Sequence, residues 1–304
     1  MSDGPPDHER QRRVEADPRT DRPFSHCILD LAPPDIAWFQ ERSDIILVPI
    51  GSCEQHGAHL PLGTDTITAL EVSRRAAAKA DVPYTPPFWA GYSPQHLRET
   101  ESGVGTVTLR ASTLNDVLYD VARSLIHHGW NKLVFVNGHG SNTKVLDPLL
   151  RRIKYVTGAF VALYKPYAER YIGLLSDLLE NPPDETPGWH ASELETSQVL
   201  AHNPALVHMD RAAQDRAQVP SWLPDSFIKK DGAPDVEFDG YQYFVFPMDH
   251  GEFSRTGVIG NPLTATAEKG EEALERFADH LVKAIDEFRP LQVSVTRRAF
   301  EDRV

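Results

Sequence analysis

Residues that could bind metal ions are concentrated in one short segment of the chain. Residues 51–65 read GSCEQHGAHLPLGTD and contain Glu54, His56, His59 and Asp65. Carboxylates and imidazoles together suit Zn, Mn, Fe or Co ions. One histidine and one aspartate alone would be read as ordinary polar loop residues. Four potential ligands within twelve residues, surrounded by glycines and a proline, favour a metal site instead.

An apolar run directly precedes this segment. Residues 44–50 read DIILVPI, which predicts a buried β-strand. In open α/β sheets, ligands bind beyond the carboxyl ends of the strands. The strand is therefore expected to deliver the four side chains to the edge of the sheet.

A second loop of the same kind lies about eighty residues later. The apolar run 131–136 predicts another buried strand, which leads into NGHGSN at 137–142. Glycines on both sides of His139 allow the backbone to turn sharply and bring the imidazole to the sheet edge. Taken alone, the same residues would also fit an Asn-Gly turn with an incidental histidine.

The third segment, 188–197, reads GWHASELETS and predicts the start of a helix that runs to about His202. On such a helix His190 and Glu193 would lie at positions i and i+3 and share a face. Glu195 would point roughly away from Glu193. The two carboxylates are therefore expected to have different roles.

Together the three segments resemble the creatininase family of metal-dependent amidohydrolases. The family pattern is a Glu-x-His pair with an Asp nine residues after the His, an Asn-Gly-His-Gly loop, and a His-Ala-x-Glu-x-Glu-Thr-Ser segment. The corresponding residues here are EQH at 54–56 with Asp65, NGHG at 137–140 and HASELETS at 190–197. Two weaker family features are GYSPQH at 91–96 and SRTGVIGNP at 254–262, so the resemblance covers roughly residues 27 to 290.

The resemblance implies a fold and a ligand set. The fold is α/β, with three layers and a largely parallel sheet flanked by helices. The site would hold two divalent ions, Zn, Mn or Fe. Asp65 would bridge them, Glu54 and His139 would complete one ion, and His56 with a second carboxylate would complete the other. A bridging carboxylate can hold two ions about 3.5 to 4 Å apart.

The second carboxylate is where this chain departs from creatininase itself. In creatininase it lies two residues after the His of the Asn-Gly-His-Gly loop, and this chain has Ser141 there. Family members with a small residue at that position use a Glu of the later helix. Glu193 is the expected ligand because it would share a face with His190, and Glu195 is the alternative.

The resemblance also implies an activity, the hydrolysis of a cyclic or linear C–N amide bond by a metal-activated water. Amide hydrolysis needs an acid to protonate the departing nitrogen. His190, with a suitable pKa near neutrality, is expected to be the proton shuttle, and Glu193 is assigned to catalysis with it. The simpler interpretation of His190 is a solvent-bonded residue at a helix start.

Three further residues are expected to bind the substrate. Ser93 and His96 would line the entrance and Trp189 would form a wall of the pocket, although each could instead be a packing residue. His59 is interpreted as a ligand or as a hydrogen-bond partner of a ligand.

Two other functions remain open. Within the family, the chain could be the peptidase that trims the precursor of the redox cofactor mycofactocin. From a different class, it could be a metal-binding module without catalysis, but a purely structural site tends to be closed and needs no proton shuttle. The sequence contains neither a Gly-x-Ser-x-Gly elbow nor a phosphate-binding glycine signature, which disfavours serine-hydrolase and nucleotide-dependent mechanisms.

Composition bounds the organisation of the chain. Its 304 residues are 40% hydrophobic, and the three motifs must converge, which favours one catalytic domain at 26–290 between a disordered arm at 1–25 and a tail at 291–304. A net charge of −13 disfavours nucleic-acid and anionic-membrane partners. Two cysteines indicate no disulfide framework, and no signal peptide or apolar run of eighteen residues is found. We expect a cytoplasmic homo-oligomer, a hexamer if the family resemblance holds.

The remaining pattern alternates strands and helices, as a parallel sheet covered on both faces requires. Expected strands are 44–50, 131–136 and 159–164, with an extended segment at 84–90; expected helices are 65–79, 112–128, 142–156, 168–179 and 264–288. Ser112 or Thr113 would cap the second helix. The irregular, aromatic-rich segment 204–253 is expected to form a lid or another functional loop.

Overall fold

A central parallel sheet organises the molecule. The computed structural model describes residues 22–98, 100–101, 103–166, 173–180, 190–229 and 232–301. The sheet has the order β1-β2-β3, with parallel pairing throughout, and its strands are β1 (Ile45–Ile50), β2 (Lys132–Asn137) and β3 (Phe160–Tyr164). On the other side of β1, the predicted extended segment adds parallel pairing through Leu47 with Tyr84 and Ile50 with Phe88.

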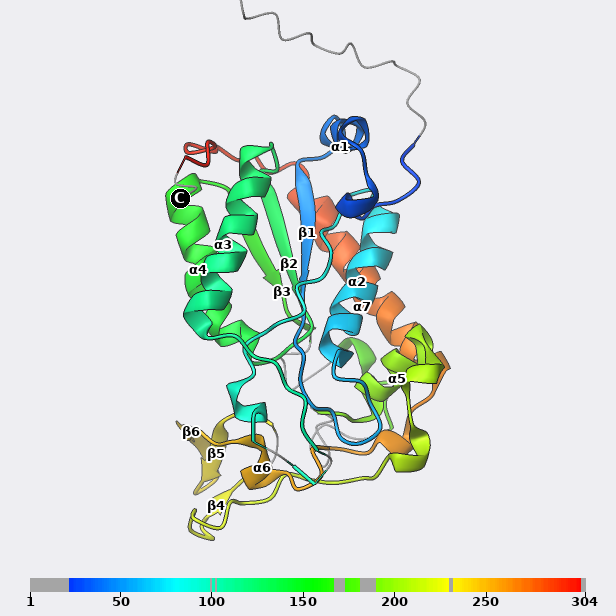
Figure 1. The fold of residues 1–304 in the computed structure, drawn as a ribbon, viewed down its shortest axis with the longest axis vertical. Helices are drawn as coiled ribbons and strands as arrows, with labels where there is room; N and C mark the ends of the chain where they lie inside the picture. Colours follow the sequence, from blue (N-terminus) through cyan, green and yellow to red (C-terminus); the bar gives the residue numbers. More distant parts are fainter. Residues whose placement is uncertain are drawn as a thin grey trace, which may run out of the picture.

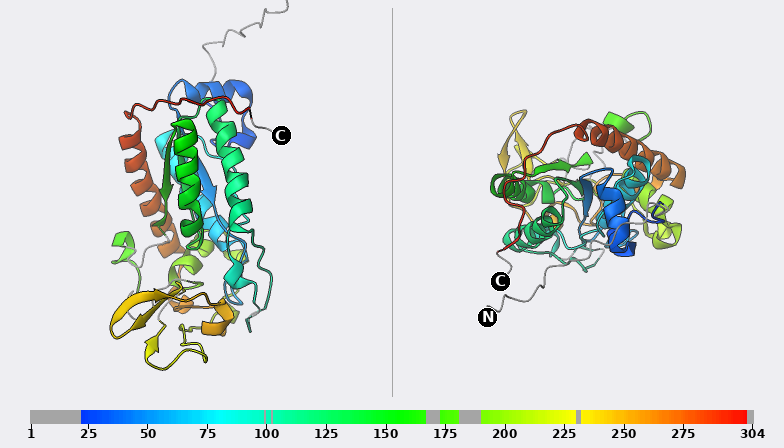
Figure 2. Two further views of the ribbon diagram at one scale, coloured as in Figure 1. Left: turned by 90° about the vertical axis from the view of Figure 1, so that its left-hand side faces the viewer. Right: turned by 90° about the horizontal axis from the view of Figure 1, so that it is seen from above.

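Helices cover both faces of the sheet, which confirms the predicted three-layer α/β architecture (Figures 1 and 2). Successive strand side chains point to opposite faces. Ile45 and Leu47 therefore pack with one set of helices and Ile46 and Val48 with the other. The first set is α2 (Thr64–Ala80), α5 (Glu193–His202) and α7 (Ala267–Phe288); the second is α1 (Pro33–Gln40), α3 (Ala111–His127) and α4 (Asn142–Thr157).

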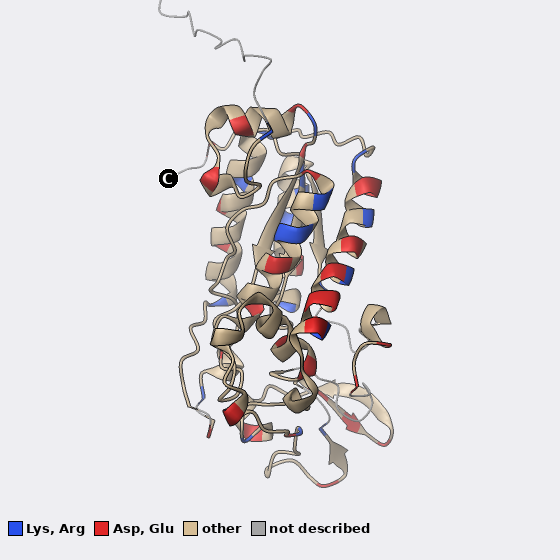
Figure 3. Cartoon of the chain, turned by 90° about the vertical axis from the view of Figure 1, so that its right-hand side faces the viewer, with Lys and Arg blue, Asp and Glu red and all other residues tan. Residues whose placement is uncertain are grey.

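The long helix α7 packs its apolar face into the core. Its apolar residues recur every three or four positions and are buried, at Leu274, Phe277, Leu281 and Ile285. Many of the other positions of α7 are Asp, Glu, Lys or Arg, which Figure 3 marks in red and blue along the ribbon. Arg75 of α2 bonds to two of the α7 carboxylates. The two helices therefore dock through an apolar seam that is flanked by ion pairs.

Helix starts differ from the predicted ones by a few residues. Helix α3 begins at Ala111, after Arg110, and neither predicted cap, Ser112 nor Thr113, precedes it. Helix α7 begins after Thr266, whose hydroxyl accepts from the N–H of Lys269 at 3.2 Å. These shifts leave the layers unchanged.

The predicted helix 168–179 is wrong for the residues that the structure describes, 173–179. Residues 168–172 of the predicted helix 168–179 lie outside the described residues, and Gly173–Leu175 is a short 3₁₀ helix followed by a turn. Arg276 of α7 donates to the carbonyl of Leu174 and pairs with Asp177 at 2.6 Å. Tertiary bonds thus replace the intrahelical bonds that the pattern suggested.

The segment 204–253 is more regular than expected. It contains the antiparallel strands β4 (Phe227–Ile228), β5 (Asp235–Phe238) and β6 (Tyr241–Val245), and the short helix α6 (His250–Phe253). Asp239 and Gly240 both have positive φ, which suits the tight hairpin between β5 and β6. The small sheet lies beyond the carboxyl ends of the parallel strands (Figure 1), beside the motif loops. Among the described helices, none is both long and apolar enough to cross a membrane.

Candidate metal centre

Four of the five predicted ligands meet at the carboxyl end of the sheet. Glu54 and His56 follow β1, His139 follows β2, and Asp65 lies in the first turn of α2. All four side chains are almost completely buried. Four ionisable groups at one buried point cannot be stable without compensating charge.

A glycine allows these loops to approach so closely. A Cβ atom at Gly138 would overlap the backbone carbonyl of Asp65. The loop after β2 can therefore pass the start of α2 only if position 138 lacks a side chain. This close passage places His139 beside Asp65.

Asp65 lies between two imidazoles. Its Oδ1 is 3.2 Å from Nε2 of His56 and its Oδ2 is 3.0 Å from Nδ1 of His139. Glu54 Oε1 lies 3.4 Å from the same His139 nitrogen, and Glu195 Oε2 lies 3.6 Å from the His56 nitrogen. Among the possible ligand groups of the described residues, two contain Asp65: Glu54, Asp65 and His139 in one, and His56, Asp65 and Glu195 in the other. A further group joins Glu54 and His56 to His190.

Backbone carbonyls determine which ring nitrogen of His56 and of His139 carries the hydrogen. His139 Nε2 lies 3.1 Å from the carbonyl of Tyr92, and His56 Nδ1 lies 3.1 Å from the carbonyl of Glu54. A carbonyl only accepts, so these nitrogens carry the hydrogens and the opposite nitrogens face the carboxylates. Within the described part of the chain, His56 Nε2 and Asp65 Oδ2 have no hydrogen-bond partner. The imidazole nitrogens and carboxylate oxygens thus face one another, an arrangement that a divalent metal ion between them would satisfy.

The electrostatics agree with that fit. Burial opposes ionisation of Asp65, but His56 and His139 outweigh it and lower its pKa. Burial also opposes protonation of His56, but Asp65 and Glu195 outweigh it and raise its pKa to about 10. Burial raises the pKa of Glu195 to about 7. The carboxylates thus attract positive charge, and a metal ion would replace the proton.

The predicted shared face of His190 and Glu193 is wrong, because helix α5 begins only at Glu193. His190 lies before the helix and forms a bridge with Ile259, whose N–H donates to its carbonyl at 2.8 Å. Ala191 then turns the chain with a φ of 54°. The helical spacing rule therefore does not apply to this pair.

Of the two glutamates of α5, the expected ligand Glu193 lies away from the cluster and the alternative, Glu195, lies at it. Glu193 does not join the cluster: its carboxylate pairs with Lys269 of α7 at 2.7 Å and accepts from the N–H of Glu180 at 3.0 Å. Glu195, the alternative, lies beside His56 and accepts from the N–H of Ala191 at 2.5 Å.

His190 faces the cluster from outside the two groups that contain Asp65. Its ring stacks on His56 with centroids 4.2 Å apart, and its Nδ1 lies 3.7 Å from Glu54 Oε1. Its Nε2 lies 2.7 Å from the carbonyl of Gln55, so that nitrogen carries the hydrogen. Burial lowers the pKa of His190 well below its ordinary value. A neutral ring with a free lone pair toward Glu54 can accept a proton there.

The predicted substrate-binding residues are only partly described. Ser93 bonds through its hydroxyl to His139 Nε2 at 3.1 Å, and His96 Nε2 lies 3.6 Å from Glu54 Oε1. Trp189 lies outside the described residues. His59 bonds to Thr196 at 3.0 Å and belongs to none of the ligand groups.

His250 is a residue that sequence reasoning missed. It begins α6 and lies buried against His96 and His190, with ring centroids 4.4 and 4.6 Å away. Its segment is irregular in sequence. The sequence does contain one signal for this residue. Asp249 and Glu252 form a capping box, which indicates that a helix begins at His250, directly before the family segment 254–262.

Comparisons with known proteins agree with this geometry. Residues 30–285 match the Creatininase family, described as creatinine amidohydrolase. The chain is 29% identical to the creatinine amidohydrolase of Pseudomonas putida (81% of this chain, 90% of that protein) and 31% identical to the mycofactocin precursor peptide peptidase of Mycobacterium tuberculosis (82% and 87%). It is 27% identical to the 3-dehydro-scyllo-inosose hydrolase of Thermotoga maritima (81% and 78%).

Solved structures show the same likeness. A crystal structure of creatinine amidohydrolase superposes with a TM-score of 0.68 at 26% identity and covers 89% of this chain and 100% of that one. Another, titled "Creatininase Mn", has a TM-score of 0.66 at 26% identity, covering 88% of this chain and 100% of that one. The match extends over most of the sequence and includes each motif loop. This protein therefore belongs to the creatininase family of metal-dependent amidohydrolases.

Proposed function

We propose that this protein hydrolyses the C–N bond of a small cyclic or linear amide at a centre of two divalent metal ions. Asp65 would hold both ions, Glu54 and His139 one of them, and His56 and Glu195 the other. The position of Asp65 carries the proposal, because its two oxygens face different imidazoles at 3.2 and 3.0 Å. Relatives named for amide hydrolysis and structures titled with Mn or Zn support it.

The bound ions would polarise the amide carbonyl and lower the pKa of a water molecule. The residues of the chain must then move the protons. Nδ1 of His190 is the acceptor for the proton of the attacking water and returns it to the departing nitrogen. The bond from its Nε2–H to the carbonyl of Gln55 holds the ring in one orientation through both steps. Glu193, paired with Lys269, is left out of this scheme.

We propose that Ser93 and His96 lie on the substrate side of the centre. Their contacts with His139 and Glu54 support this placement. The wall formed by Trp189 stays a prediction.

A second candidate activity is peptide trimming. It is favoured by the 31% identity to mycofactocin precursor peptide peptidases over more than four fifths of both proteins. The same centre would serve, since a peptide bond is also an amide. The alternatives then differ in substrate and not in mechanism.

The deciding experiment loads the purified protein with Zn or Mn and follows hydrolysis by mass spectrometry, as the addition of one water to a cyclic substrate or the cleavage of a linear one. The panel contains creatinine, other cyclic and linear amides, a peptide with the C-terminus of a ribosomal precursor, and a polyhydroxylated cyclic ketone. We expect at least one amide to be cleaved, with activity lost on chelation and restored by metal. Protein that holds two ions per chain and cleaves no amide would contradict the proposal, as would activity that persists after verified metal removal.

We also propose that the chain works as a cytoplasmic homo-oligomer, a hexamer as the family resemblance implies, with residues 26–290 as its catalytic domain. Within the proposed tail, Val295 packs into the core beside α3 and α4, and Arg298 donates to the carbonyl of Ile126 at 2.8 Å. Light scattering of the full chain would test the oligomeric state.

A further inference from the structure

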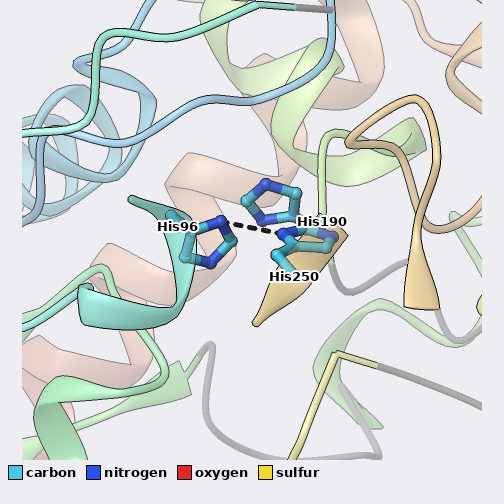
Figure 4. Close-up of side chains that lie close together, drawn as sticks. All are labelled: His96, His190 and His250. Atoms are coloured by element: carbon cyan, nitrogen blue, oxygen red, sulfur yellow. Dashed lines mark hydrogen bonds between the residues drawn. The ribbon is translucent and has the colours of Figure 1, made fainter. Parts of the chain in front are cut away.

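Three buried histidines meet beside the metal centre. His96 ends the 3₁₀ helix Pro94–His96, His190 precedes α5, and His250 begins α6. Their ring centroids lie 4.4 to 4.8 Å apart. Figure 4 shows the three rings side by side, with a hydrogen bond between His96 and His250.

The side-chain amide of Gln55 points at all three rings. Its Oε1 accepts from the N–H of Gly57 at 3.1 Å, which fixes the orientation of the amide. Its Nε2 then lies 3.2 Å from His96 Nδ1, 3.3 Å from His190 Nε2 and 3.1 Å from His250 Nδ1. The amide nitrogen only donates, so at least one of these ring nitrogens must be without a hydrogen.

The contacts favour one assignment of the hydrogens in this cluster. His190 Nε2 carries its hydrogen, because it bonds to the carbonyl of Gln55. His96 Nδ1 and His250 Nδ1 are 2.8 Å apart, so one of them carries a hydrogen. The carbonyl of Gln55 takes the hydrogen of His190, but among the described residues no backbone carbonyl bonds to the ring of His96, so the Glu54 carboxylate, 3.6 Å from its Nε2, favours the hydrogen on that nitrogen. His96 Nδ1 can then offer its lone pair to the Gln55 amide at 3.2 Å. His96 Nδ1 is therefore bare, and His250 donates to it.

This assignment argues against a third cation site. The three nitrogens that surround the Gln55 amide would form one if they all offered lone pairs. Two of them, on His190 and His250, carry hydrogens. The remaining lone pair, on His96, accepts from His250 and from Gln55.

We propose that His250 is a positioning residue for the metal centre. It donates its Nδ1–H to His96, which fixes His96 with its Nε2–H toward Glu54 and so holds that carboxylate in place for metal binding. The link from Glu54 to a metal ion rests on the proposed function, whereas the hydrogen assignment does not.

The direct test is a long-range ¹H–¹⁵N spectrum of the full-length protein with ¹⁵N-labelled histidine, loaded with diamagnetic zinc. His96→Gln and His250→Asn variants identify the two sets of signals. We expect hydrogen on Nε2 of His96 and on Nδ1 of His250. A His96 ring with hydrogen on Nδ1, or a His250 ring with hydrogen only on Nε2, would overturn the proposal.

Matched substitutions of His250 test whether its hydrogen bond to His96 supports metal binding. Asn can place an amide N–H near the Nδ1 position, whereas Leu fills similar space without a donor. His250→Leu is expected to weaken zinc affinity roughly 10- to 100-fold, the usual effect of losing a partner behind a metal ligand, and His250→Asn to restore most of it. His202→Leu is the control, because His202 bonds to Glu71 away from the centre.

Zinc affinity is measured on variants whose circular dichroism and thermal unfolding match the wild type. Equal affinity in His250→Leu and wild type would overturn the proposal, and so would an equal loss in His250→Asn and His250→Leu. Failure to find an amide substrate would count against the proposed function alone, because neither zinc affinity nor the spectrum depends on turnover.

Discussion

At the scale of single residues, Asp65 has the contacts that a bridging ligand requires, because it belongs to one group with Glu54 and His139 and to another with His56 and Glu195. Asp65→Asn keeps the shape of the side chain but removes its charge. We expect it to lose both ions, whereas Glu54→Gln and Glu195→Gln each lose about one ion of two. Elemental analysis of dialysed protein gives the ion count.

Glu193→Gln is the matched control for that series, since Glu193 pairs with Lys269 and not with a candidate ligand. It should keep both ions. Two ions retained by Asp65→Asn, or lost by Glu193→Gln in folded protein, would show that the ligands are wrongly assigned.

His190 separates metal binding from proton transfer. Its Nδ1 faces Glu54 while its Nε2–H is held by the backbone, so His190→Gln removes the proton acceptor and spares the ligands. We expect near-normal metal content and turnover lowered by roughly 10² to 10⁴-fold. Loss of metal in this variant would identify His190 as a ligand, and near-normal turnover would remove it from the mechanism.

At the scale of elements, the loop after β2 depends on close passage over the start of α2. Gly138→Ala would force its Cβ against the carbonyl of Asp65. We expect it to destabilise the fold by about 1–3 kcal/mol and to weaken metal binding, because Asp65 and His139 are pushed apart. Thermal unfolding and zinc titration measure the two effects.

Gly63→Ala is the matched control, because a Cβ at position 63 meets nothing within 4 Å although it too lies beside α2. Equal behaviour of the two variants would mean that the close passage does not position the site.

The strand-end loops were predictable because their geometry is local. Parallel strands β1 and β2 place their carboxyl ends at the same edge, so Glu54, His56 and His139 converge once the strands are recognised. The third carboxylate, Glu195, was not predictable in this way. Its identity depends on the bridge of His190 to Ile259, which delays the start of α5 until Glu193. Such a long-range bond leaves no periodic signal in the segment itself.

His250 illustrates the same limit. It lies 154 positions after its partner His96, in a segment whose pairing only the folded chain reveals. The layers, in contrast, follow from the alternation of strand residues and from the apolar residues spaced three or four apart on α7. Both patterns can be read from a short stretch of sequence. Prediction thus succeeded where a single element determines the outcome and failed where two distant segments do.

At the scale of the whole molecule, metal binding is expected to stabilise the fold, because the centre joins loops after β1 and β2 to the starts of α2 and α5. Metal that binds only the native state, at 100 times its Kd, adds about 2.7 kcal/mol. Thermal unfolding with and without zinc should show a higher midpoint with metal. Asp65→Asn should show no such shift, and a shift of wild-type size in that variant would locate the stabilising metal elsewhere.

The docking of α5 on α7 makes the two halves of the centre unequal. A Cβ at Gly270 of α7 would overlap the carbonyl of Ser197, so the helices touch through their backbones, and Lys269 clamps Glu193 one turn away. This contact positions α5, which carries Glu195, whereas Glu54 and His139 lie on the loops after β1 and β2. Asp65 lies at the start of α2, several turns before the Arg75 pairs that join α2 to α7. Local opening of α7 would therefore loosen the ion beside Glu195 more than its neighbour. The ion beside Glu195 should exchange with metal in solution much faster than its neighbour. The rate of that exchange would then measure how often α7 separates locally from the rest of the fold.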